Sequence, residues 1–118
     1  MNKIFLIGNL TKDPVLRTVK TEKAEKAVAN FTVAVNRVHS ANDKDADFFP
    51  IVVWGSMAES CGKYLKKGSR VCVVGPLQTK SYDAEDGLKR YTMEVNAAEV
   101  QFLSAKPDEE KKEGKKNN

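Results

Sequence analysis

Residues that commonly carry catalysis are few in this chain. It has one histidine, His39, so a Ser-His-Asp triad or a histidine metal site has no support beyond chance. Acidic residues gather at 43–47 and 83–86, but both stretches are polar, whereas a general acid or base needs partial burial to tune its pKa. No glycine-rich phosphate loop is present. The sequence therefore predicts a protein that is not an enzyme and that needs no metal or cofactor.

The two cysteines, Cys61 and Cys72, lie in apolar patterns and form no CxxC motif. They are predicted to be buried free thiols, which fits a reducing compartment. The apolar run at 4–7 is too short for a signal peptide, and no run reaches the roughly 18 apolar residues of a membrane span. We therefore expect a cytoplasmic protein without a membrane partner.

A second set of residues, aromatic and basic, has the chemistry to bind nucleic acid. Aromatic rings stack on unpaired bases, and cations follow the phosphates. Phe48 and Trp54 are six positions apart, which is about 20 Å in a strand, and Tyr82 stands where another strand meets its turn. The net charge of +4 suits an anionic partner. The nearby cations are Lys3, Lys12, Arg17, Arg37, Lys80, Lys89 and Arg90.

The segment that carries Phe48 and Trp54 is apolar on both faces. Strand alternation separates the side chains of even and odd positions, and one of the two sets must enter the core. The other set must be covered by an oligomer, covered by another element, or used for binding, so Trp54 is either a core residue or a binding residue. Pro50 has no N–H and should lie at an edge or a bulge. The two sets are Phe48, Pro50, Val52 and Trp54 against Phe49, Ile51 and Val53.

Most of the chain has the pattern of β-strands. The clearest is 30–36, where Phe31, Val33 and Val35 alternate with polar or small residues. Residues 4–7 form another, with Gly8 as a bend or bulge. Polar loops or turns are predicted at 19–26, 39–47 and 83–87. The remaining strand segments are 48–55, 71–74 and 90–95, with 77–82 and 99–103 as two further candidates.

One helix is predicted at about 56–67. The segment from Ser56 to Glu59 has the S-x-x-E form of a capping box, and Gly68 stands as a C-cap. Five or six strands then surround a helix that lies between the third and fourth strands. An OB-fold has its helix at this point in a five-stranded, partly open Greek-key barrel, whereas a βαβ sheet needs several helices. We therefore predict an all-β OB-fold.

The chain divides into a domain at 1–105 and a tail at 106–118. The tail has five lysines, four acidic residues and no apolar residue except Pro107, so we expect it to be disordered.

Four stretches in order resemble the bacterial-type single-stranded DNA-binding protein family: NKIFLIGNLTKDPVLR, VANFTVAVNR, DFFPIVVWGSMAESCGKYLKKGSRVCVVGPLQT and RYTMEVNAAEVQFL. They cover about residues 2–104. The resemblance implies an OB barrel assembled as a homotetramer. It also implies sequence-independent coating of single-stranded DNA in replication, recombination and repair, in the cytoplasm and associated with the nucleoid.

The resemblance also implies site residues. Phe48, Trp54 and Tyr82 match the base-stacking aromatics of the family, and His39 stands where the family usually has another aromatic. Pro50 and Ser56 replace residues that are often basic, which would weaken phosphate contacts there. The phosphate-binding residues are expected among Lys3, Lys12, Arg17, Arg37, Lys66, Lys67, Lys80 and Arg90.

Family members usually end in an acidic tip that recruits replication or repair proteins. This sequence stops at Lys115-Lys116-Asn117-Asn118, so recruitment through such a tip is not expected, and the chain is either shortened or a short member. Two other functions stay open: an OB-type module that binds protein more than DNA, and an OB-fold nuclease. Quenching of Trp54 fluorescence by oligo(dT) would distinguish DNA binding from the first, and metal-dependent loss of substrate would reveal the second.

Deleting residues 106–118 should leave folding and oligomerisation intact, because the segment has almost nothing apolar to bury. Thermal melts and light scattering of the full and shortened chains would test this. A large loss of thermal stability would show that the tail packs against the domain.

Overall fold

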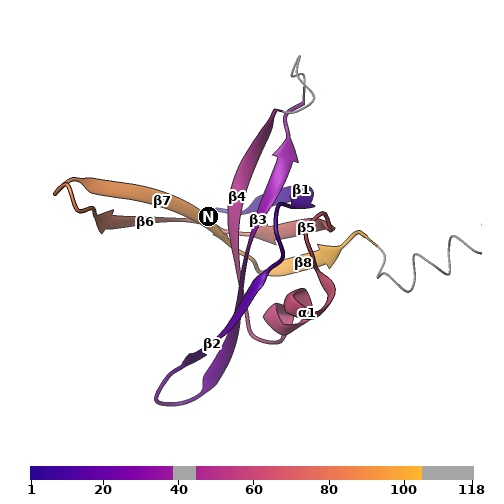
Figure 1. The fold of residues 1–118 in the computed structure, drawn as a ribbon, viewed down its shortest axis with the longest axis horizontal. Helices are drawn as coiled ribbons and strands as arrows, with labels where there is room; N and C mark the ends of the chain where they lie inside the picture. Colours follow the sequence, from indigo (N-terminus) through magenta and orange to yellow (C-terminus); the bar gives the residue numbers. More distant parts are fainter. Residues whose placement is uncertain (39–44, 105–118) are drawn as a thin grey trace, which may run out of the picture.

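The computed structural model describes residues 1–38 and 45–104, so the predictions for His39 and for the tail lie outside the described residues. The described chain forms one eight-stranded sheet and one α-helix (Figure 1). The elements are β1 (Ile4–Leu10), β2 (Val15–Lys20), β3 (Glu25–Asn36), β4 (Ala46–Trp54), α1 (Ser56–Tyr64), β5 (Arg70–Gly75), β6 (Leu77–Asp83), β7 (Lys89–Asn96) and β8 (Glu99–Phe102).

The strands follow the order β6-β7-β4-β3-β1-β5-β8, and β2 pairs with β3 outside this path. All pairs are antiparallel except β4 with β7. β1 joins β3 through only two residue pairs, Asn9 with Ala34 and Leu10 with Val33, and β4 joins β7 through two as well. Figure 1 shows the β6–β7 hairpin and the β3–β4 ribbon diverging from the barrel. The predicted all-β, partly open OB barrel with one helix before the strand at 71–74 is confirmed. The sheet has eight strands rather than five, and the helix lies between β4 and β5 rather than between the third and fourth strands, because β2 was not predicted.

The core lies on one face of the strands and under α1. β-Branched residues favour strands because they pack well on a pleated surface, and here they alternate inward. A fully buried valine or isoleucine contributes about 1.5–3 kcal/mol relative to an exposed one. The core includes Leu6, Leu10, Phe31, Val33, Ile51, Val53, Ala58, Cys61, Val71, Val73 and Val95.

β1 runs through Gly8 with no extra residue against β5, so of the predicted bend or bulge the bulge is wrong. Its register with β5 is continuous from Ile4 to Asn9. Gly8 has a different role, because a Cβ at this position would lie 2.2 Å from the carbonyl oxygen of Ala34. The absence of a side chain therefore lets β1 cross closely over β3.

The predicted loop at 19–26 is also wrong, since β2 extends to Lys20 and β3 begins at Glu25. The turn covers only 21–24, where the backbone N–H of Thr21 donates to the carbonyl oxygen of Ala24 at 2.8 Å. Most side chains of this hairpin are exposed on both faces, so its strands carry no apolar alternation. β3 therefore looked shorter in the sequence, and β2 was missed.

α1 is shorter than predicted and is not capped as predicted. Its N-cap is Gly55, at φ 76°, with no side-chain cap hydrogen bond, so Ser56 does not start a capping box. The helix ends at Tyr64 because Leu65 is extended and turns its side chain into the core. Gly68, at φ 89°, belongs to the turn that follows rather than to the C-cap.

The two cysteines differ. Cys61 on α1 is fully buried, and burial raises the pKa of its thiol to about 11. Cys72 on β5 is only half-buried and pairs across the sheet with Ile7, so its predicted burial is wrong.

In a Cys72→Ser variant, Cys61 should react with a thiol reagent at pH 8 only when the protein unfolds, because the thiolate is the reactive form. Its folded-state pKa of about 11 keeps the thiol protonated until the pH rises well above 8. Labelling with and without denaturant measures this. Rapid labelling of the native variant would contradict the burial of Cys61.

Candidate nucleic-acid interface

Two aromatic rings of β4 face away from the core. Phe48 is 63% exposed and Trp54 is 44% exposed. Between them in the sequence, Ile51 and Val53 are fully buried and Phe49 packs against the core cluster. The alternative left open by the sequence is therefore decided: Trp54 is not a core residue. Pro50 lies just outside the two pairs that join β4 to β7, so its edge position is confirmed.

The same side of the sheet continues over β3 and β2. In register, Arg17 of β2 lies opposite Val28 of β3, which lies opposite Trp54 of β4. Two strand spacings place Arg17 and Trp54 about 10 Å apart on one face. Nε of Arg17 also donates to Oδ1 of Asn30 at 3.4 Å. A predicted cation and a predicted stacking ring are thus brought together.

The β6–β7 hairpin adds the third ring. Tyr82 is 55% exposed and lies opposite Arg90, and Lys80 lies opposite Thr92. Val52 of β4 lies beside Asn96 of β7, so alternation puts these hairpin residues on the face of Trp54. We call this side of the sheet the outer face. It carries Arg17, Asn30, Thr32, Phe48, Pro50, Val52, Trp54, Lys80, Tyr82, Arg90 and Glu94.

Asn30 and Thr32 are outer-face residues that no sequence motif marks as functional. They pair in register with Val52 and Pro50, so they lie between the positions of Trp54 and Phe48. Their side chains can donate and accept hydrogen bonds. Period-two alternation of β3 was the only signal in the sequence that could have found them.

Acidic side chains neutralise part of the predicted cation set. Nζ of Lys80 lies 2.7 Å from Oε1 of Glu94, and Arg90 pairs with Asp86. These partners were not predicted, because cross-strand pairs depend on the register of β6 with β7. The outer face is therefore less positive than its lysines and arginines alone indicate.

Arg37 lies on the other side of the ribbon from Phe48. Its guanidinium donates twice to Oδ1 of Asp47, at 2.8 and 3.1 Å, and Asp47 lies opposite Val35 on the side of Phe49. The hydrogen bond from Arg37 lowers the pKa of the Asp47 carboxyl, and the same bond raises the pKa of Arg37. The pair is therefore fully charged at neutral pH, and Arg37 does not join the outer-face cations.

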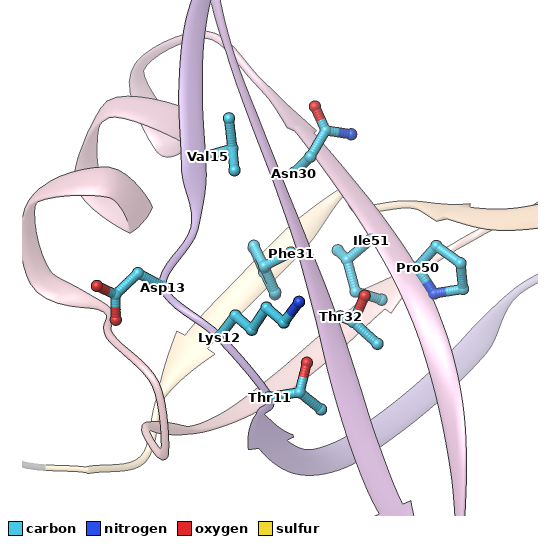
Figure 2. A pocket seen from close by; sticks show the side chains of 9 residues that line it. All are labelled: Thr11, Lys12, Asp13, Val15, Asn30, Phe31, Thr32, Pro50 and Ile51. Carbon is cyan, nitrogen blue, oxygen red and sulfur yellow. The ribbon is translucent and has the colours of Figure 1, made fainter.

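The other predicted cations lie elsewhere. The backbone N–H of Lys67 donates to Oδ1 of Asp13 at 2.8 Å, which brings Lys66 and Lys67 next to the turn that holds Lys12. Lys12 lines a cleft of about 220 Å³ between this turn, β3 and β4. Figure 2 shows Lys12 reaching toward Thr32, while Asp13 points away. Nζ of Lys3 lies 5.9 Å from the centre of the Phe5 ring.

Within residues 1–38 and 45–104, no cluster of three or more potential metal ligands is found. No helix in that part of the chain is long and apolar enough to cross a membrane.

Comparison with known proteins adds independent information. Residues 1–103 match the model of the single-strand binding protein family. The chain is 53% identical over 104 residues to "Single-stranded DNA-binding protein 3" of Clostridium acetobutylicum, which covers 87% of this chain and 71% of that protein. "Single-stranded DNA-binding protein" of Clostridium tetani is 49% identical over 104 residues, or 87% of this chain and 70% of that one. "Single-stranded DNA-binding protein 1" of Clostridium acetobutylicum is 46% identical over 110 residues, or 92% of this chain and 98% of that one.

Phe48 and Phe49 are adjacent residues of one type on opposite faces, so they make a matched pair. Phe49→Ala should lower the free energy of unfolding by roughly 2–4 kcal/mol, because Phe49 packs against the core. Phe48→Ala should change it by about 0.5 kcal/mol or less, as expected for a surface site. Urea unfolding of both variants would measure this. Equal losses would contradict the assigned faces of β4.

Proposed function

The chain belongs to the single-strand binding protein family and binds single-stranded DNA, and we propose that the outer face is where it does so. In this proposal Phe48, Trp54 and Tyr82 stack on bases, while Arg17, Lys80 and Arg90 contact phosphates. The observation that carries it is the position of the three rings. Each is exposed on the face opposite the core, although large aromatic side chains are usually buried.

Base stacking explains binding that does not depend on sequence. Every base has a flat π-face, so a ring accepts any of the four bases, and the cations contact a backbone that is the same at every nucleotide. The protein therefore acts by occupying the strand, as a binding protein and not as an enzyme. Coating of exposed strands in replication, recombination and repair follows from this activity.

We propose in addition that the chain works as a homo-oligomer, with the tetramer implied by the resemblance as the expected state. Support comes from Phe5 and Ile7 on β1, which are 68% and 50% exposed. Both lie on one side of β1, and Ile7 is beside the half-buried Cys72 of β5. An apolar patch on a sheet is a common place for a second copy to pack. We propose a cytoplasmic, nucleoid-associated location, because the ligand of the protein is DNA and the nucleoid holds the DNA.

Lys12, Lys66 and Lys67 are proposed as secondary phosphate contacts. Figure 1 shows the turn between α1 and β5 on the opposite side of the barrel from the β6–β7 hairpin. A strand that reached both regions would have to pass around the barrel. Lys3 and Arg37 stay untested candidates, and Arg37 is the weaker one because it is paired with Asp47 away from the outer face.

Tyr82→Ala should weaken binding of labelled oligo(dT), measured by fluorescence anisotropy, whereas Tyr91→Ala should not. Both rings are exposed on the same hairpin, but Tyr91 lies on the opposite face, opposite Ser81. Stacking on an aromatic is worth about 1–3 kcal/mol per base in single-strand binding proteins of this kind. The expected loss is therefore about 5- to 150-fold. An equal loss for both variants, or none for Tyr82→Ala, would contradict the proposed face.

A further inference from the structure

Two of the outer-face cations already hold an anion in the free protein. Nζ of Lys80 is 2.7 Å from Oε1 of Glu94, and the guanidinium of Arg90 pairs with Asp86. By contrast, Arg17 contacts only the neutral Asn30, and no carboxylate of the described residues pairs with it. Pairing is therefore confined to the hairpin part of the outer face.

Glu94 lies between the stacking rings. It is opposite Gln78 on β6 and two positions before Asn96, which lies beside Val52 of β4. Its side chain is 20% exposed, against 59% for Lys80. A strand that runs from Tyr82 to the rings of β4 must pass over this carboxylate.

A DNA phosphate and the Glu94 carboxylate need the same partner. Both are anions that accept hydrogen bonds from an ammonium, and a phosphate within reach of Lys80 would also lie within a few ångströms of Glu94. The Lys80 side chain is 59% exposed, so water reaches and weakens the ion pair from that side, and a phosphate can displace the carboxylate.

We propose that Glu94 is a built-in competitor for single-stranded DNA, occupying Lys80 in the free protein and giving way to a phosphate in the complex. The inference rests on the proposed function, because it requires Lys80 to contact DNA. Glu94 then lowers the affinity and favours release of the strand. Asp86 competes in the same way for Arg90 at the end of the hairpin, because the two side chains form an ion pair.

The test compares the wild type with Glu94→Gln, Lys80→Gln, the double variant and a control, Glu85→Gln, on the full chain. Glu85 is on the same hairpin, and its change removes the same charge, but it makes no ion pair within the described residues. Glu94→Gln keeps the size of the side chain. Binding of labelled oligo(dT) is measured by anisotropy at several salt concentrations, and thermal melts check folding.

Glu94→Gln should raise the affinity about two- to fivefold at low salt, the range that an exposed ion pair is worth. The slope of log K against log salt should stay close to that of the wild type, because Lys80 contacts one phosphate in both complexes. Glu85→Gln should have a smaller effect on the affinity. In the Lys80→Gln background, the effect of Glu94→Gln should fall to that of the control. Asp86→Asn, which frees Arg90 on an exposed turn, should also raise the affinity.

The outcomes distinguish the phosphate contact of Lys80 from the competition by Glu94. If Lys80→Gln leaves the affinity unchanged, Lys80 is not a phosphate contact, and both this inference and that part of the proposed function fail. If Lys80→Gln weakens binding but Glu94→Gln does not strengthen it, the proposed function stands and the competition is overturned. Equal gains in affinity for Glu94→Gln and Glu85→Gln would show that only the net charge of the protein matters. That result would also overturn the competition.

Discussion

The strand β4 is apolar on both faces, but only one face of a barrel strand can pack into the core. Phe49, Ile51 and Val53 meet the side chains of β1, β3 and β5 and fill the core. Because successive side chains of a strand point in opposite directions, Phe48 and Trp54 must then face outward. The exposed rings are thus a direct consequence of core packing, and the rest of the proposed interface is arranged around them by the register of β2, β3 and β7.

In the proposed interface, the outer face combines base stacking that ignores sequence with cations that are partly neutralised by carboxylates. Rings on β4 and on the β6–β7 hairpin present π-surfaces that suit any base. The hairpin cations are paired with Glu94 and Asp86, whereas Arg17 is beside a neutral amide. A coating protein must bind tightly and must also be removed from the strand. Weak internal ion pairs that exchange with phosphates are one physical way to meet both needs.

Much of this arrangement could be predicted from the sequence wherever burial leaves a pattern. The alternation of β4 predicted its two faces, and apolar strands around one helix predicted the barrel. Burial leaves no such pattern in β2 or in the start of β3, where side chains are mostly exposed, so β2 was missed and β3 was predicted too short. The partners of Lys80 and Arg90 depend on cross-strand register, and the orientation of Arg37 depends on its bond to Asp47. Neither can be predicted from spacing along the chain.

The central claim is that Trp54 contacts bases, and its fluorescence tests this directly because it is the only tryptophan in the chain. Titration with oligo(dT) should quench the emission to a saturating end point, because a stacked base lies against the ring. Added salt should reverse the quenching as phosphate contacts are lost, and duplex DNA of equal length should produce little of it. Full complex formation by anisotropy with unchanged Trp54 emission would contradict the account.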